Sequence, residues 1–282
     1  MWARSGGSSH TWVRVGGSAS GRLGVNALVQ SGQRCGWQTT FLAVALLGVI
    51  AFAGIALLVP RGIAGSAPSS LLAQLSVLKK PRLLLVYAMT TLGYGGSFIA
   101  FTYLATILEQ VAGFTPGSVG LVMLVYGVSV AFGNLWGGRL ADRKGPVRAL
   151  QIVFALLALV LFVLGFTAAS KAAVLVTVLA WGAVAFGNVP GLQVYVVRRA
   201  ERDAPGAVDV ASGLNIAAFN VGIALGAWGG GLIVAHLGLM HTPWIGGLIV
   251  VGAFLLTTLA GWLDRRDPAP RTVPAARVAA MH

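Results

Sequence analysis

Residues 137–150 read Gly-Gly-Arg-Leu-Ala-Asp-Arg-Lys-Gly-Pro-Val-Arg-Ala-Leu and lie between two long apolar runs. One acid and four cations are crowded into this stretch, although only 10% of the 282 residues are charged. Charges at this density are too costly to bury in hydrocarbon, so the sequence predicts a water-facing turn between two membrane spans. The excess of cations places this turn on the cytoplasmic side of the membrane.

The composition of the whole chain is that of a membrane protein. Hydrophobic residues make up 57% of it, whereas soluble domains are about 45–50% apolar and about 25% charged. The net charge of +13 does not indicate a nucleic-acid partner, because the cations lie in clusters between apolar runs and form no single basic face. Cys35 is the only cysteine, and four scattered histidines have no ligand spacing, so we expect neither a metal nor a cofactor.

Seven apolar runs are long enough to cross the membrane as helices, which takes about 20 residues for a core of about 30 Å. The predicted spans are 38–59, 83–108, 117–137, 149–168, 172–197, 210–235 and 243–263. Barrel strands would be about half as long and would alternate in polarity. The predicted fold class is therefore an all-α membrane protein with seven transmembrane helices.

Basic clusters follow the first, third, fifth and seventh spans, which indicates a multi-pass protein of the cell membrane with its C-terminus in the cytoplasm. Residues 60–82 and the tail 267–282 are then cytoplasmic. Seven crossings would put the N-terminus outside, yet residues 1–37 are rich in Gly, Ser and Arg, carry no acid, and are expected to be disordered. Either further helices belong before Trp37, or this segment is a cytoplasmic tail and one span is misassigned.

Residues 138–150 have the pattern Gly-x-Leu-Ala-Asp-Arg-x-Gly-x-x-Arg-x-Leu, which resembles a loop motif of the major facilitator superfamily of secondary transporters. The pattern departs from that motif at Pro146 and Val147, where the family usually has cations. Residues 188–197 and 209–228 resemble the tenth and eleventh helices of its drug and sugar efflux branch, the arabinose-efflux-permease-like proteins. The resemblance covers about residues 36–266 and maps the seven spans onto helices six to twelve.

This resemblance implies a six-helix C-terminal transporter half over 83–266, one preceding helix over 38–59, and a linker between halves over 60–82. It also implies export of small organic molecules, drug-like or sugar-like, by alternating access coupled to protons. The missing N-terminal half, or a second copy of the chain, is expected to be needed for activity, because the substrate site of such folds lies between two halves. The lipid bilayer, the substrate and the proton are thus the expected partners.

The motif residues Gly138, Asp142, Arg143 and Gly145 form the predicted gating motif. The two glycines permit a tight turn and a close approach of helices. Asp142 could accept hydrogen bonds from Arg143 or Arg139 and release them when the two halves rock, which would make it a latch. The alternative is that the cations only anchor the loop at the inner leaflet.

Uncharged polar residues inside the spans are the candidates for a substrate path. Tyr94, Ser97, Asn215 and Asn220 lie deepest and should face the bundle interior or a cavity. Each could instead be an interhelical hydrogen bond without a ligand. No Asp, Glu, Lys or Arg lies in the middle of any span, so a proton carrier would belong to missing helices or to a partner.

Gly222, Gly226 and Gly230 recur every four positions and put a smooth stripe on one helix face, which suits close helix packing or sliding between helices. Enzymatic chemistry is not expected, since the chain has no paired carboxylates, phosphate loop or nucleophile with its base. Two alternatives to a transporter remain at this point: a truncated membrane fragment that does not transport, and a seven-helix receptor.

Overall fold

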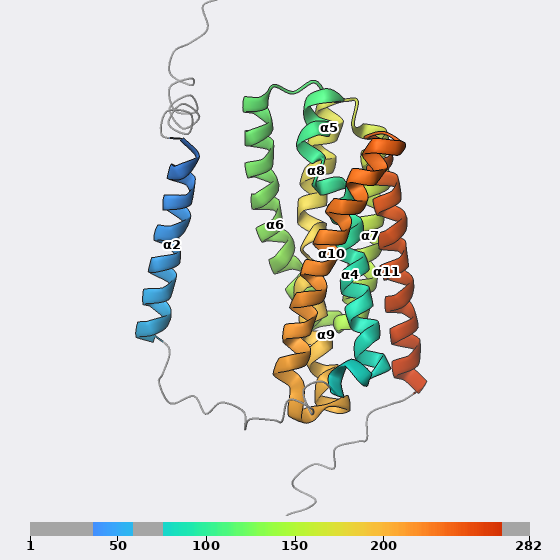
Figure 1. Cartoon of the computed structure of the whole chain (residues 1–282). Coiled ribbons are helices and arrows are strands. Elements are labelled where there is room, and N and C mark those ends of the chain that lie inside the picture. The colour runs from blue at the N-terminus through green and yellow to red at the C-terminus, as the bar shows by residue number, and fades with distance from the viewer. Residues whose placement is uncertain (1–35, 59–75, 267–282) are drawn as a thin grey trace, which may run out of the picture. The chain divides into compact units, whose positions relative to one another are not determined.

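The computed structural model describes residues 36–58 and 76–266 (Figure 1). The chain divides into two units, Met1–Ser66 and Ala67–His282, which we describe separately. In the first unit the structure describes one helix, α2 (Gly36–Leu58). This helix coincides with the predicted span 38–59, and its last part, Gly48–Leu58, is an apolar stretch.

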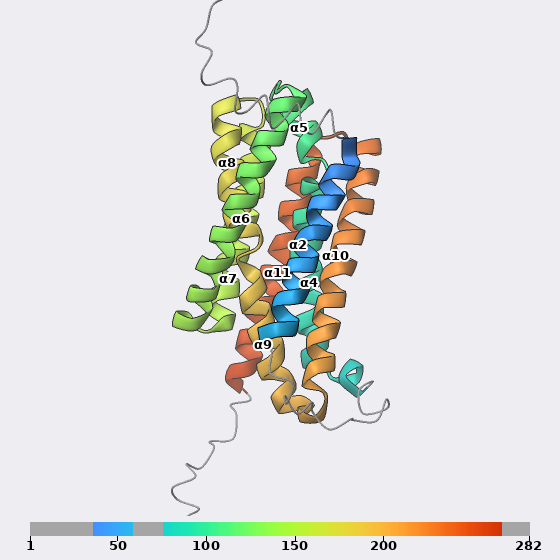
Figure 2. The same cartoon turned by 90° about the vertical axis from the view of Figure 1, so that its left-hand side faces the viewer.

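The second unit is a helical bundle whose long helices run side by side (Figures 1 and 2). Its elements are η1 (Ser76–Lys79), α4 (Pro81–Phe101), α5 (Leu104–Gln110), α6 (Pro116–Lys144), α7 (Pro146–Thr167), α8 (Lys171–Ala185), α9 (Asn188–Asp203), η2 (Pro205–Ala207), α10 (Val208–His236) and α11 (His241–Arg266).

Six helical stretches of this unit are long and apolar enough to cross a membrane, and they confirm the last six predicted spans. They are Pro81–Gln110, Pro116–Lys144, Pro146–Thr167, Lys171–Asp203, Pro205–His236 and His241–Arg266. Each stretch begins within five residues of its predicted start, and two of them, Pro116–Lys144 and Lys171–Asp203, run well beyond the predicted ends into charged residues. Arg and Lys can continue a helix past the hydrocarbon because their long apolar stems lie along the helix while the charge reaches water.

The helices differ in how much of their surface other helices cover. In α4 and α5 together, 67% of the most apolar window is buried, whereas the values for α6 and α10 are 22% and 17%. Helix α4 is the centre of the bundle and packs against α10 and α11, while α11 also packs against α7, and α6 packs mainly against α8 (Figures 1 and 2). Helices α6 and α10 therefore leave broad apolar faces uncovered in this unit.

Two of the spans are interrupted. Thr102 and Tyr103 separate α4 from α5, and Phe186 and Gly187 separate α8 from α9. The second break lies within the predicted span 172–197, beside Gly187, Pro190 and Gly191. These three residues predict a kink in that span from the sequence, since proline removes a helix hydrogen bond. Pro190 is the third residue of α9, where its missing N–H costs nothing because the first-turn N–H groups have no partner within a helix.

The predicted water-facing turn over 137–150 is too long. Helix α6 continues through Lys144, α7 begins at Pro146, and Gly145 alone makes the turn between them. The motif is thus mostly helical, and its cations Arg143 and Lys144 occupy the last turn of α6. Cations are favourable there, because the C-terminal end of a helix carries partial negative charge.

Candidate functional site

A cavity of about 280 Å³ lies between four helices of the bundle. It is lined by residues of α4, α6, α9 and α10 and by the break before α9: Thr90, Tyr94, Asn134, Phe186, Val189, Leu192, Gln193, Asn215, Ile216 and Phe219. None of these side chains is charged. We call this space the central cavity.

Two of the four predicted path residues line the central cavity, Tyr94 and Asn215. Tyr94 is 3% exposed, and its ring lies edge-on to Phe219 at 3.9 Å and to Phe186 at 6.1 Å between ring centroids. The Oδ1 atom of Asn215 accepts a hydrogen bond from the Thr90 hydroxyl at 2.7 Å. The Asn215 amide thus lines the same cavity as the rings of Tyr94, Phe186 and Phe219, which we call the aromatic corner.

The structure places the other two path residues elsewhere. Ser97 is buried, and its hydroxyl accepts a hydrogen bond from the Trp181 indole N–H at 3.1 Å. Asn220 is exposed, and its amide donates to the Ile216 carbonyl at 2.9 Å. Asn220 follows Asn215 by five residues, about 140° around a helix. The two amides of α10 therefore face different directions.

Sequence reasoning missed the aromatic lining of the central cavity. Phe186 and Phe219 lie beside Tyr94 and line the central cavity with it. Their positions carry no signal of their own, because an aromatic residue in an apolar span is ordinary. An uncharged space with aromatic rings and a few amide or hydroxyl groups suits a neutral, partly apolar molecule.

The gating-motif residues lie at the junction of α6 and α7. Gly145 has φ 79°, a backbone conformation that favours glycine, and so makes the predicted tight turn possible. At Gly138 a Cβ atom would come no closer than 3.8 Å to Pro190, so close helix approach does not require glycine there. The close approach is one residue earlier, where a Cβ on Gly137 would clash with the Gly187 carbonyl oxygen.

Asp142 and Arg143 are exposed on the last turns of α6. Within residues 36–58 and 76–266, the expected hydrogen bonds from Arg139 or Arg143 to Asp142 are absent, and the ion pairs that do form involve other residues. The Asp142 carboxylate is accordingly available to a group outside the described chain.

The glycine stripe of α10 lies directly against α4. A Cβ atom would come within 2.6 Å of the Thr91 carbonyl oxygen at Gly222, within 2.5 Å of the Gly95 oxygen at Gly226, and within 2.9 Å of the Ile99 oxygen at Gly230. Real Cβ atoms essentially never come this close to backbone oxygen. These three glycines allow the backbones of α4 and α10 to lie in contact.

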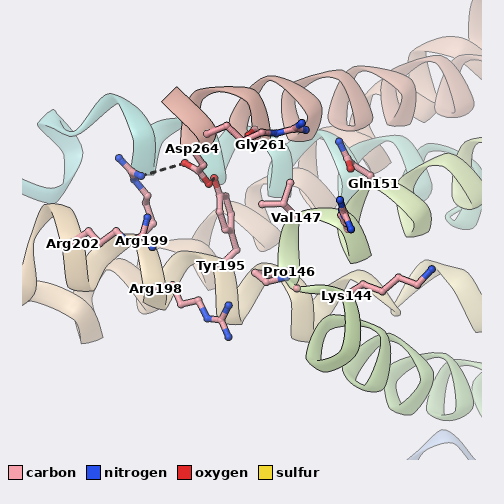
Figure 3. A pocket seen from close by; sticks show the side chains of 13 residues that line it. Lys144, Pro146, Val147, Gln151, Tyr195, Arg198, Arg199, Arg202, Gly261 and Asp264 are labelled. Carbon is pink, nitrogen blue, oxygen red and sulfur yellow. Dashed lines mark hydrogen bonds and ion pairs between the residues drawn. The ribbon is translucent and has the colours of Figure 1, made fainter. Parts of the chain in front are cut away.

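A second polar group, which sequence reasoning also missed, joins three helices at one end of the bundle. Figure 3 shows its members Asp264, Tyr195 and Arg199. Asp264 of α11 accepts hydrogen bonds from the Tyr195 hydroxyl at 2.8 Å and from Arg199 at 3.2 Å, both on α9. Arg199 also pairs with Asp203 at 2.8 Å, and Arg82 at the start of α4 lies 4.0 Å from Asp264. Asp264 is an acid among arginines near the end of a span, and this pattern could have identified it.

These features describe a polytopic membrane protein with an uncharged cavity between its helices, and the described residues hold no cluster of three or more His, Cys, Asp or Glu side chains that could bind a metal. The family model of the Major Facilitator Superfamily matches residues 14–209. The chain belongs to this superfamily.

Several curated proteins are similar to this chain. The uncharacterized MFS-type transporter YtbD of Bacillus subtilis is 50% identical over 84% of this chain and 59% of its own length. The inner membrane transport protein YdhP of Escherichia coli K12 is 35% identical over 87% of this chain and 61% of its own length. A chloramphenicol resistance protein of Streptomyces lividans is 32% identical over 73% of this chain and 51% of its own length. The chain thus spans about three fifths of the length of the first two relatives.

Proposed function

We propose that this chain is the C-terminal six-helix half, with one preceding helix, of an efflux transporter that exports small organic molecules, drug-like or sugar-like, by alternating access. The observation that carries the proposal is the central cavity, which Tyr94, Asn215 and their neighbours line without a single charge. A neutral substrate would stack on the aromatic corner and bond the amide. The chloramphenicol resistance protein among the relatives is named for a neutral aromatic drug.

Helices α6 and α10 supply the reason to expect a second half. Both help to line the central cavity, and both leave most of their apolar windows uncovered. Asn220 lies on the uncovered part of α10, where its amide N–H bonds the Ile216 carbonyl of the same helix and its remaining polar groups would need partners in place of lipid. We expect another six-helix half, or a second copy of the chain, to cover these faces and to complete the substrate path.

Asp142 has the exposure that a latch between two halves requires. An unpaired carboxylate at a helix end can bond a cation or a helix N-terminus of an opposing half in one state and release it in the other. The close contact of α4 with α10 at the glycine stripe would let these helices move as one body during that change.

We further propose that the charged end of the bundle and the C-terminus face the cytoplasm, since the basic loops gather there. Proton coupling is part of the proposal too. The charged side chains of the described bundle lie at helix ends and in loops, so the proton-carrying group would come from the other half. Because the chain belongs to a family of transporters, we no longer propose the alternative of a seven-helix receptor.

The test compares Asn215→Leu with Thr258→Val in cells that produce this chain together with the part of YtbD that it does not cover. Thr258 is an exposed polar residue of α11 that does not line the central cavity, so its variant is the control. Loss of one neutral hydrogen bond to substrate raises the half-saturating chloramphenicol concentration roughly 2- to 10-fold. Equal chloramphenicol export by the two variants would remove the central cavity from the path.

A further inference from the structure

A second cavity, of about 540 Å³, opens at the charged end of the bundle (Figure 3). Its walls come from the end of α6, the start of α7, and the ends of α9 and α11. The geometry points to a binding site for a phosphate group in this space, which we call the basic pocket. The inference draws on the proposed function only for the side of the membrane that the pocket faces.

The charge of the basic pocket is the first support. Its lining includes only one carboxylate, that of Asp264, but six cations: Lys144, Arg148, Arg198, Arg199, Arg202 and Arg265. Within residues 36–58 and 76–266, the side chains of Lys144, Arg148, Arg198 and Arg202 form no ion pair or hydrogen bond. Four of the six cations therefore line one cavity without a counter-ion from the described residues.

The single carboxylate of the lining does not neutralise these cations. Both oxygens of Asp264 are engaged, one by the Tyr195 hydroxyl and the other by Arg199. Asp203 takes a second bond from Arg199, whose side chain is only 6% exposed. This buried group forms one wall of the pocket and leaves Arg148, Arg198 and Arg202 available to an outside anion.

The start of α7 adds backbone donors to the wall of the basic pocket. Gly145 occupies the N-cap position and has no side chain with which to bond the first-turn N–H groups. Pro146 follows, and the next two residues, Val147 and Arg148, both line the basic pocket. The first turn of α7 carries no acid. The backbone N–H groups of this first turn can therefore add donors for an anion that the four neighbouring cations attract.

Phosphate is the anion that fits these groups best. Guanidinium groups bond phosphate oxygens in pairs, and backbone N–H groups at a helix N-terminus supply further donors. A volume of this size admits a headgroup. Because the pocket lies at the ends of membrane spans, the headgroup of an anionic phospholipid is at the right depth to enter it. Inorganic phosphate offers the same chemistry from solution.

The simpler interpretation is that these cations only set the topology of the chain. That role needs positive charge near the inner leaflet but no particular placement. It predicts that any two exposed arginines at this end contribute equally to lipid binding. A phosphate-binding site predicts that the arginines of the basic pocket contribute more to lipid binding than the arginines outside it.

The experiment titrates the purified full chain in detergent with dioctanoyl phosphatidylglycerol or dioctanoyl phosphatidylcholine and counts bound lipids by native mass spectrometry. The pocket variant is Arg148→Gln with Arg202→Gln. The control is Arg139→Gln with Arg266→Gln, which removes the same charge from positions outside the lining. A third variant, Arg148→Lys with Arg202→Lys, keeps the charge, and thermal unfolding checks that all variants fold.

We expect the wild-type chain to retain phosphatidylglycerol over phosphatidylcholine. The pocket variant should lose about 25-fold in affinity, at about fivefold for each cation, while the control and the lysine variant keep most of it. If 10-fold excess sodium phosphate displaces the lipid, free phosphate is the ligand; if it does not, the lipid headgroup is. Equal retention of the two lipids, or an equal loss of phosphatidylglycerol affinity in the pocket and control variants, would contradict a phosphate-binding site in the basic pocket. Lipid counting needs no transport, so this result and the export assay can fail separately.

Discussion

The substitution Gly226→Ala tests whether contact between α4 and α10 holds the bundle together. A Cβ at this position would lie 2.5 Å from the Gly95 carbonyl oxygen and 3.1 Å from Cβ of Phe98. The first distance falls about 0.9 Å short of the 3.4 Å at which ordinary van der Waals contact begins. Backbone cannot turn away as a side chain can, so the two helices must separate. Overpacking of this kind costs about 1–3 kcal/mol.

Gly229→Ala is the matched control, because a Cβ at Gly229 of the same helix meets no atom within 4 Å. Alanine favours a helix over glycine by about 1 kcal/mol at either position, so this contribution cancels between the two variants. The free energy of unfolding in mixed detergent micelles with SDS should be about 1–3 kcal/mol lower for Gly226→Ala than for Gly229→Ala. A difference below about 0.5 kcal/mol would refute the close contact.

Two more substitutions test the polar groups of the bundle. Asp264→Asn removes the negative charge that Arg199 and Tyr195 contact and should lower the free energy of unfolding by about 1–3 kcal/mol. The control Glu201→Gln, at an exposed position, should change the free energy of unfolding by less than about 0.5 kcal/mol. Equal effects of the two substitutions would contradict a structural role for Asp264. Asn188→Leu should leave stability unchanged or raise it by about 1 kcal/mol, because Asn188 is 1% exposed and neither polar atom of its side chain has a partner among the described residues. A marked loss of stability in the same SDS titration would show that this amide is bonded.

The spans could be predicted from sequence because apolar length alone decides them. The predicted ends failed where charge continues a helix: Arg143 and Lys144 stand in α6, and the arginines after Val197 stand in α9. A hydropathy pattern marks where hydrocarbon ends, and a helix does not have to end there. Pro190 and its neighbouring glycines did predict the interruption between α8 and α9, because proline acts on the backbone itself.

The candidate site was predictable only in part. Depth in a span selects polar residues such as Asn215 and Asn220, but it does not tell which side of the helix faces a cavity. That choice depends on how α10 packs on α4, and the glycine stripe that determines the packing was visible. Measured from Gly222, Asn215 lies seven residues earlier and so falls close to the same face, whereas Asn220 does not. The contacts of Asp264 join residues 65 or more positions apart, and no local pattern predicts such partners.

Chloramphenicol flux in proteoliposomes tests the central claim most directly. The full chain is reconstituted either alone as a monomer or together with the part of YtbD that it does not cover, and flux is measured with a proton gradient imposed. The proposed function predicts flux in the paired sample and none in the monomeric chain, because each half forms only part of the path. Flux through the monomer alone, or none in a paired sample whose halves copurify, would contradict it.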